Sequence, residues 1–280
     1  MRGLFTFAVL AAVLMHGAAH AQCAKPGALG VSRVMTVDPR VMPVVGSHDY
    51  RRTLPLAPGE VVLTFDDGPR PAYTSQVLKA LSDECLRATF FVVGRQARAY
   101  PQWVRHLRAS GHTVGTHSQN HPMARLSPER TAAEIDAGVA SVGAALGTQP
   151  APFFRFPGLY RTRHGEEHLR RRGLMAWSVD VDSKDYTRAS ADTVLRQTLD
   201  GLQRRRGGIL LMHDIQPKTA RILPALIANL KSRGFRVVHV VPRGQGAPEM
   251  MARAQATSAD VAAGEGFLLI FPEATARARR

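Results

Sequence analysis

The sequence predicts an α/β fold, a distorted (β/α)7-type barrel of mostly parallel strands with an N-terminal arm. Two observations support this prediction. From Glu60 to about residue 242, short apolar runs of strand length alternate with amphipathic stretches of helical length, which is the pattern of successive βα units around a parallel sheet. Polar clusters follow several of the apolar runs, and the carboxyl ends of the strands in such a barrel meet at one rim.

The first segment, residues 1–21, reads as a secretory signal peptide. A lone Arg2 precedes an apolar stretch from Leu4 to Met15, and small residues then lead to Ala21, as in a cleaved export signal. The apolar stretch is shorter than the roughly 20 residues that a membrane-spanning helix needs. We therefore expect an exported protein, periplasmic or secreted, with no membrane span in its mature form.

Three further segments follow the signal. Residues 22–59 are rich in Pro, Gly and Arg and form the predicted N-terminal arm, residues 60–242 form the predicted catalytic domain, and residues 243–280 form a C-terminal tail. The domain has seven predicted strands, at residues 60–66, 87–93, 111–116, 152–156, 174–181, 208–213 and 235–241. One helix is expected to begin after Thr74 and Ser75, and another runs from Ser127, a capping residue before Pro128, to about Leu146.

Net charge and cysteine content bear on partners and compartment. The formal charge is +15, which favours contact with anionic polysaccharide or the cell envelope. The basic residues are scattered and have no interleaved aromatic residues, so we expect no nucleic-acid binding. Cys23 and Cys85 are the two cysteines, and either a disulfide bond or two buried thiols is compatible with an exported chain.

Two polar clusters together suggest a metal site. Asp66 and Asp67 follow the first strand of the domain, and His117 and His121 follow the third. Two imidazoles four residues apart on a helical turn share one face. Joined by one carboxylate, they form a ligand set that leaves coordination positions open for water and substrate. Taken alone, the Asp-Asp-Gly-Pro segment is equally typical of a surface turn.

Five segments of the chain resemble, in order and spacing, the five motifs of the polysaccharide deacetylase family, the NodB-like carbohydrate esterases. The resemblance covers about residues 60–242, and the first two motifs are the most specific. The segments are Thr64-Phe65-Asp66-Asp67-Gly68-Pro69, His117-Ser118-Gln119-Asn120-His121, Arg155-Phe156-Pro157-Gly158, Asp182-Ser183-Lys184-Asp185-Tyr186 and Leu210-Leu211-Met212-His213-Asp214.

The resemblance implies a role for each matched position. The metal ligands would be Asp67, His117 and His121, around a divalent ion for which Zn²⁺ is the first choice and Co²⁺ or Ni²⁺ are alternatives. Asp66 would be the general base acting on water, supported by Arg155, and His213 would be the general acid.

The fourth motif leaves the partner of His213 open. Asp182 matches by its distance to Asp185, and Asp180 matches by its distance from Trp177; of the two, Asp180 is favoured. The remaining substrate-binding positions are Pro157, Gly158, whose backbone N–H is a candidate oxyanion donor, Tyr186, where the family usually has Trp, and Leu211, which would line the pocket for the acetyl methyl group.

The expected function is metal-dependent hydrolysis of acetyl groups, in the first place N-acetyl groups, from a carbohydrate polymer or oligomer. One alternative is a zinc metallopeptidase, since His164, Glu167 and His168 fit an H-x-x-E-H pattern. Gly165 and the nearby arginines disfavour it, and we expect an exposed amphipathic helix there. Another alternative is a non-catalytic carbohydrate-binding module, which usually lacks a base or a ligand; here every such position is filled.

Overall fold

The computed structural model describes residues 25–244. The predicted signal peptide and most of the predicted tail, 243–280, therefore lie outside the described residues. Within the described range, no helix combines the length and apolar character that a membrane crossing requires.

The described residues contain one ten-stranded sheet, and all of its strand pairings are parallel. All seven predicted strand regions contain strands, and the region 174–181 divides into two short strands, β7 and β8. The strands are β1 (Val31–Val37), β2 (Val44–Val45), β3 (Glu60–Asp66), β4 (Thr89–Val92), β5 (Thr113–Thr116), β6 (Phe153–Phe154), β7 (Met175–Trp177), β8 (Val181–Asp182), β9 (Gly207–His213) and β10 (Arg236–Pro242).

Strand β3 is at the centre of the sheet. The order is β1-β10-β3-β4-β5-β6-β7-β2, and β9 pairs with both β3 and β8. All seven residues of β3 are buried, as expected for a strand covered on both faces. Its register with β9 runs from Glu60 opposite Gly207 to Asp66 opposite His213. Asp66 and His213 therefore end neighbouring strands on the same edge of the sheet.

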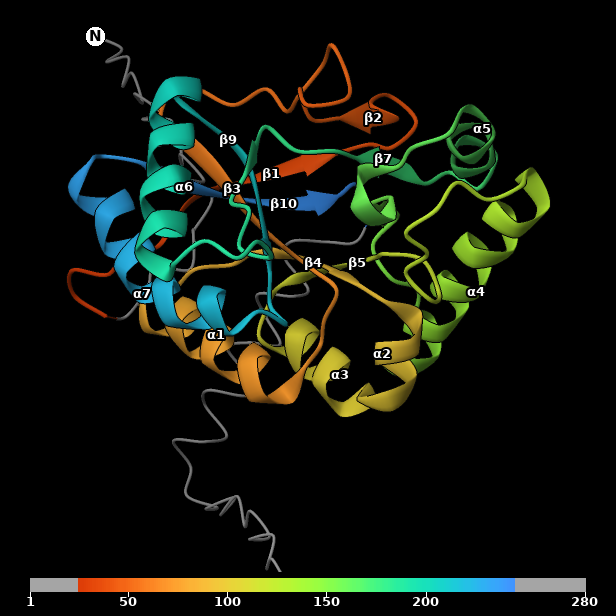
Figure 1. Cartoon of the computed structure of the whole chain (residues 1–280), viewed down its shortest axis with the longest axis horizontal. Coiled ribbons are helices and arrows are strands. Elements are labelled where there is room, and N and C mark those ends of the chain that lie inside the picture. The colour runs from red at the N-terminus through yellow and green to blue at the C-terminus, as the bar shows by residue number, and fades with distance from the viewer. Residues whose placement is uncertain (1–24, 245–280) are drawn as a thin grey trace, which may run out of the picture.

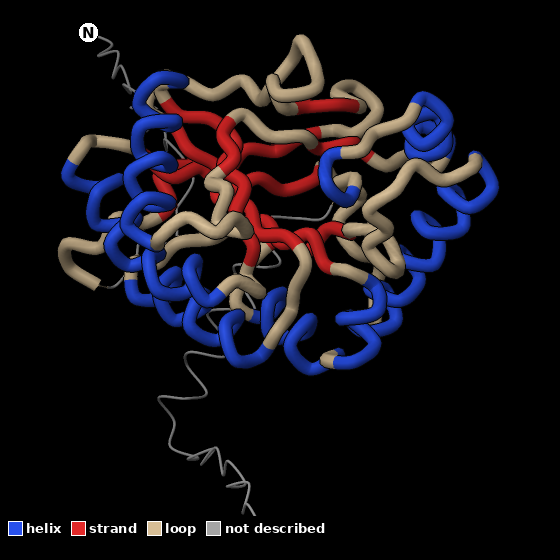
Figure 2. Tube along the Cα trace, in the orientation of Figure 1, coloured by secondary structure: helices blue, strands red, loops and turns tan. Residues whose placement is uncertain are grey.

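In the view of Figures 1 and 2, helices line the left, lower and right sides of the strands, whereas β2 lies at the upper edge. This arrangement is the α/β fold predicted from the sequence, with the parallel strands of a distorted barrel inside. The helices are α1 (Pro71–Asp83), α2 (Gly94–Ala99), α3 (Pro101–Ala109), α4 (Pro128–Leu146), α5 (Arg163–Arg171), α6 (Ala191–Arg205) and α7 (Pro217–Ser232), with one 3-10 turn, η1 (Pro157–Leu159).

The two predicted helix starts have different outcomes. Helix α4 begins at Pro128 after Ser127, whose side chain accepts a hydrogen bond from the Arg130 N–H, so this prediction is confirmed. The predicted start of α1 after Thr74 is wrong, because the helix begins at Pro71. The Thr74 hydroxyl lies inside the first turn, where it accepts from the Arg70 N–H at 2.8 Å and donates to Asp214 at 2.5 Å.

The segment predicted as an arm contributes strands to the sheet. β1 pairs in parallel with β10, and β2 pairs in parallel with β7. The stretch Val31–Val37 contains three valines and a threonine, and this β-branched composition is a strand signal that the sequence analysis did not use. Cys85 is disulfide-bonded; Cys23, its only possible intrachain partner by sequence, lies outside the described residues.

Candidate active site

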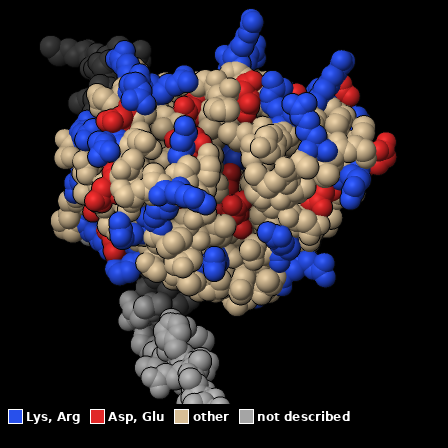
Figure 3. Space-filling model, in the orientation of Figure 1, with Lys and Arg blue, Asp and Glu red and all other residues tan. Residues whose placement is uncertain are grey.

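The strand ends bring four predicted site residues to one edge of the sheet. Asp66 ends β3 and His213 ends β9, while His117 follows β5 and Arg155 follows β6. Because these strands are parallel, their carboxyl ends converge, as the positions of the polar clusters predicted. In Figure 3, acidic side chains lie in a hollow near the middle of the face shown.

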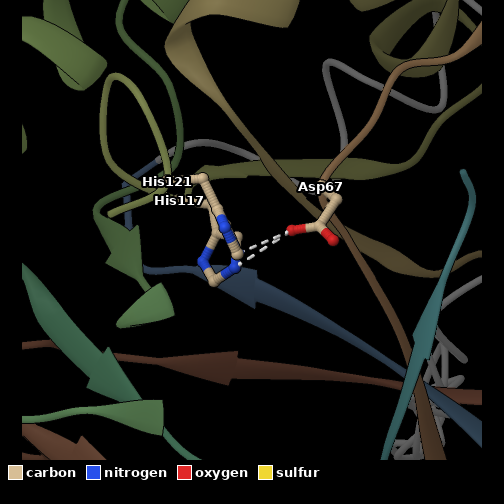
Figure 4. A group of neighbouring side chains, drawn as sticks. All are labelled: Asp67, His117 and His121. Atoms are coloured by element: carbon tan, nitrogen blue, oxygen red, sulfur yellow. Dashed lines mark ion pairs between the residues drawn. The ribbon is translucent and has the colours of Figure 1, made fainter. Parts of the chain in front are cut away.

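Asp67, His117 and His121 form a cluster of potential metal ligands. One ligand atom from each residue lies within 4.8 Å of the other two. The Asp67 Oδ1 atom is 3.0 Å from His121 Nε2 and 3.4 Å from His117 Nε2. Figure 4 shows the two imidazoles side by side, with the Asp67 carboxylate pointing toward them. The three side chains thus face a common point.

The donor atoms of this cluster fit a divalent ion. Asp67 Oδ1 is buried, and among the described residues it has no partner with hydrogen-bond geometry. The carbonyl oxygen of Arg155 lies 2.7 Å from His117 Nδ1. Since a carbonyl can only accept, Nδ1 carries a hydrogen, and Nε2, which faces Asp67, is the nitrogen left to bind a metal ion. One carboxylate oxygen and two imidazole nitrogens are ligands that suit zinc and related metals.

The charge state of Asp67 is consistent with a role as a metal ligand. Burial by itself raises the pKa of the Asp67 carboxyl, but His117 and His121 beside it outweigh burial and hold that pKa well below its usual range. The carboxylate is therefore ionised at neutral pH, as a metal ligand must be.

The two adjacent aspartates point to different partners because the chain turns between them. Asp66 is still in β3, whereas Asp67 has a left-handed φ of 76°. Asp66 Oδ1 accepts a hydrogen bond of 2.7 Å from Arg155 Nη1. The Arg155 side chain is fully buried and also donates to the Thr64 hydroxyl and the Ser178 carbonyl. This contact is the one predicted between Arg155 and Asp66.

The two histidines are brought together by a loop instead of the helical turn that their spacing suggested. Residues 117–121 contain no helix, and both Ser118 and His121 have left-handed backbones, with φ of 63° and 57°. The Ser118 hydroxyl accepts a hydrogen bond of 3.0 Å from the His121 N–H. The loop therefore turns sharply enough to return His121 to the side of His117.

The structure corrects the prediction for the partner of His213. His213 Nδ1 donates to Asp185 Oδ1 at 2.6 Å, and the His213 backbone N–H donates to Asp185 Oδ2 at 2.7 Å. Asp185 is fully buried, and the Thr219 hydroxyl also donates to it. Burial alone lowers the pKa of His213, but Asp185 outweighs burial and, with smaller contributions from Asp67 and Asp66, raises that pKa to about 9.

Asp180 and Asp182, the two carboxylates considered for this pairing, bind other groups. Asp180 accepts hydrogen bonds from the Ser47 N–H and hydroxyl, the Thr53 hydroxyl and the Ile209 N–H. It therefore joins the N-terminal segment to β9 at the start of that strand. Asp182 accepts a hydrogen bond of 2.8 Å from the Lys184 N–H and one of 2.9 Å from the Tyr186 hydroxyl.

The predicted substrate-contacting positions lie close to these groups in the chain. Leu211 is buried in β9 opposite Asp182. The Tyr186 side chain is half exposed, and its ring meets the His213 ring edge-on with centroids 5.4 Å apart. Pro157 is buried and opens η1, and Gly158 within it has a left-handed φ of 59°. A Cβ at Gly158 would also come within 3.0 Å of Tyr160 and Met123, so this position favours glycine.

The alternative peptidase motif does not form a ligand cluster. His164 Nε2 lies 3.0 Å from the Thr131 hydroxyl, and His168 Nε2 lies 3.0 Å from Asp136. Glu167 pairs with Arg163 on the exposed face of α5. Among the described residues, these three side chains are not part of any group that could hold a metal ion.

Sequence reasoning missed two further carboxylates that support the site. Asp185 belongs to the fourth motif, but the sequence favours Asp180 as the partner of His213. Glu134, on α4, accepts hydrogen bonds from the loop that carries His117 and His121. Spacing alone does not distinguish Asp185 from the nearby Asp180 and Asp182. No sequence signal indicated Glu134 either, since its contact depends on how α4 packs.

Comparison with known proteins agrees with this geometry. The family model described as polysaccharide deacetylase matches residues 54–177. A chitooligosaccharide deacetylase from Sinorhizobium fredii is 33% identical over 218 residues, which cover 70% of this chain and 97% of the relative. A peptidoglycan-N-acetylglucosamine deacetylase from Bacillus cereus is 30% identical over 187 residues, or 62% of this chain and 66% of that protein.

A solved structure shares both fold and sequence with the chain. The peptidoglycan deacetylase of Bdellovibrio bacteriovorus superposes with a TM-score of 0.69 at 30% identity, covering 76% of this chain and 59% of that one. The match to nearly the whole length of the Sinorhizobium relative, together with the ordered motifs, shows the family. The chain belongs to the polysaccharide deacetylase family, the NodB-like carbohydrate esterases, and is a hydrolase of that class.

Proposed function

We propose that this protein removes acetyl groups from a carbohydrate polymer or oligomer, in the first place N-acetyl groups of an aminosugar, and that a divalent metal is required. The observation that carries the proposal is the convergence of Asp67, His117 and His121 on one point, with Asp66 and His213 ending the strands beside it. The relatives named above act, by their names, on chitooligosaccharide or on peptidoglycan N-acetylglucosamine, which supports this substrate class.

Asp67, His117 and His121 would hold the metal, for which Zn²⁺ is our first choice and Co²⁺ or Ni²⁺ are alternatives. A divalent ion there would polarise the acetyl carbonyl and lower the pKa of water from about 15.7 toward 7. The side chain next to this site is Asp66, which is 2% exposed. Such a buried carboxylate is well placed to take the proton of the attacking water.

Arg155 supports Asp66 in this role. Its guanidinium compensates the negative charge of Asp66 inside the protein, where an unpaired charge is costly. The 2.7 Å hydrogen bond also fixes which carboxylate oxygen remains free, because Oδ1 is engaged by Arg155. Oδ2 is thereby left to act as the base.

His213 would act as the general acid. An amine departs readily only after protonation, so N-acetyl hydrolysis needs a proton donor on the leaving-group side. Asp185 holds the His213 ring by Nδ1, which leaves Nε2 to carry the transferred proton. The Gly158 N–H would stabilise the oxyanion, and Leu211 would contact the acetyl methyl group.

The site of action in this proposal is the cell envelope or its surroundings. The N-terminal sequence has the pattern of an export signal, and the formal charge of +15 favours anionic surfaces. We therefore propose a periplasmic or secreted enzyme that meets acetylated polysaccharide there.

The roles of Asp66 and His121 can be separated by measurement. We expect Asp66→Asn to abolish acetate release, a loss of about 100-fold or more, while bound zinc measured by elemental analysis stays at the wild-type level. His121→Ala should lose both activity and metal, because it removes a ligand. Retained turnover in purified Asp66→Asn protein would contradict the assignment of the base.

The substrate class is tested by acetate release from chitin oligomers, peptidoglycan and acetylated xylan, each with and without a chelator. We expect release from the two N-acetylated substrates, loss of that release with chelator, and recovery on adding Zn²⁺. Release from acetylated xylan alone would instead indicate an O-acetyl esterase. Undiminished activity after complete metal removal would refute the metal requirement.

A further inference from the structure

The carboxylate of Glu134 holds the loop that carries His117 and His121. The backbone N–H groups of Gln119 and Asn120 donate to Glu134 Oε2 at 3.1 and 2.8 Å. The Asn120 side-chain amide donates to the other oxygen, Oε1, at 2.7 Å. One half-buried side chain on α4 thus binds the two residues that precede His121 in the loop.

The same loop is also held by the start of α2. The Gly94 N–H donates to the Ser118 carbonyl at 2.9 Å, and the Arg95 N–H donates to the Gln119 carbonyl at 2.8 Å. Helix α2 therefore binds the loop carbonyls, whereas Glu134 binds the loop N–H groups. Hydrogen bonds to a charged acceptor are stronger than those between neutral groups, so the α4 side provides the stronger restraint.

Helix α4 lies directly against this loop. A Cβ atom at Gly138, one turn after Glu134, would lie 2.6 Å from the carbonyl carbon of Ser118. The absence of a side chain there permits the close approach that the three hydrogen bonds require. Ser118 and His121 have left-handed backbones, which residues with a Cβ rarely adopt without support from their surroundings.

We propose that Glu134 is a positioning residue for the metal centre. Its carboxylate fixes the loop conformation in which both imidazoles face Asp67, although it does not itself belong to the ligand cluster. This inference rests on the proposed function, since it assumes that the cluster of Asp67, His117 and His121 binds a metal. Loss of groups that orient metal ligands typically weakens metal affinity by about 10- to 100-fold.

The test is metal affinity, measured on the full-length protein after removal of bound metal. Zn²⁺ is titrated by calorimetry, and Co²⁺ is added separately because its absorption spectrum reports ligand geometry. For Glu134→Ala we expect a Kd for Zn²⁺ about 10- to 100-fold higher and an altered Co²⁺ spectrum. Glu134→Gln keeps one acceptor oxygen and should fall between Glu134→Ala and wild type.

Asn120→Ala is the matched control, because it removes only the side-chain bond to Glu134 and keeps both backbone bonds. We expect its Kd to stay within about three-fold of wild type. A thermal melt of each metal-free variant shows whether the fold is intact. If Glu134→Ala does not fold, the comparison rests on Glu134→Gln.

Two results would contradict the proposed positioning role of Glu134. One is Zn²⁺ affinity within about two-fold of wild type in a folded Glu134→Ala or Glu134→Gln protein. The other is unfolding of both variants, which would make Glu134 a general structural residue. Failure of the wild type to bind Zn²⁺ would overturn the proposed function as well, whereas tight binding by both wild type and Glu134→Ala would overturn only the role of Glu134.

Discussion

At the scale of single residues, the pairing of His213 with Asp185 sets the pH range of the proposed acid. Burial alone lowers the pKa of His213, and Asp185 with the nearby aspartates outweighs burial, which gives a pKa of about 9. The protonated form is required to donate, so activity should be lost as the pH rises through the pKa. A bound cation adds positive charge nearby, and the metal-loaded enzyme should therefore lose activity at or somewhat below pH 9.

Replacement of Asp185 tests this pairing. Asp185→Asn removes the charge that raises the pKa of His213, so we expect the high-pH limb of kcat to move to lower pH and kcat to fall by about 100-fold or more. Asp182→Asn is the control, because its carboxylate contacts Lys184 and Tyr186 and does not contact His213. An unchanged high-pH limb in Asp185→Asn would show that His213 is not the group whose deprotonation lowers kcat at high pH.

Asp180 should matter for stability, in contrast to the catalytic role expected from its position in the sequence. Its carboxylate accepts four hydrogen bonds from Ser47, Thr53 and Ile209. Asp180→Ala leaves these donors without an acceptor, and each buried unsatisfied donor costs about 1–3 kcal/mol. We expect urea unfolding to show a loss of about 2–5 kcal/mol, with the pH dependence of kcat unchanged. A shifted pH profile of kcat with normal stability would instead support Asp180 as the partner of His213.

The convergence of Asp67, His117 and His121 could be predicted from the sequence, whereas the partner of His213 could not. Asp67, His117 and His121 each follow or end a strand, and parallel strands bring such positions together whatever the details of the turns. Asp180, Asp182 and Asp185 differ only in their distance from the neighbouring elements. The chain bends at Asp180, between β7 and β8, so counting residues does not show which carboxylate reaches the end of β9.

At the scale of elements, the first strands belong to the same core as the catalytic domain. Met35, Val37, Val45 and Leu54 are buried in one cluster that also contains side chains of the central strands. Burial of a large apolar side chain contributes about 1.5–3 kcal/mol to the free energy of folding. The net stability of a whole domain is only about 5–15 kcal/mol. We expect a chain that begins at residue 60 to be insoluble or unfolded, judged by circular dichroism and by its elution volume on size exclusion. Cooperative unfolding of that shorter chain would show that residues 22–59 are an independent arm.

Some elements agree with the sequence prediction in detail, whereas β1 and the start of α1 do not. Strand β3 has the predicted bounds, and α4 has a capping serine followed by a proline. The start of α1 was placed too late because the Thr74 hydroxyl was assigned to capping. In the structure this hydroxyl donates to Asp214, 140 residues away. A contact between residues so far apart cannot be predicted from the local sequence.

At the scale of the whole molecule, the charge should influence which substrates bind well. The formal charge is +15, and on the face in Figure 3 the Lys and Arg side chains surround a hollow that holds acidic ones. Fields of exposed charges extend about 10 Å at 0.1 M salt and about 3 Å at 1 M. Added salt should therefore weaken the attraction of an anionic polymer but leave a neutral one unaffected.

We therefore expect the KM for peptidoglycan, which has carboxylates, to rise several-fold between about 50 mM and 500 mM NaCl. The KM for a neutral chitin oligomer should stay nearly constant over the same range, because uncharged sugars are not drawn by the field. Acetate release on both substrates at each salt concentration measures the difference, with kcat as the internal check that the site itself is intact. An equal rise of KM with salt for both substrates would show that salt acts on the active site and that the surface charge does not select the substrate.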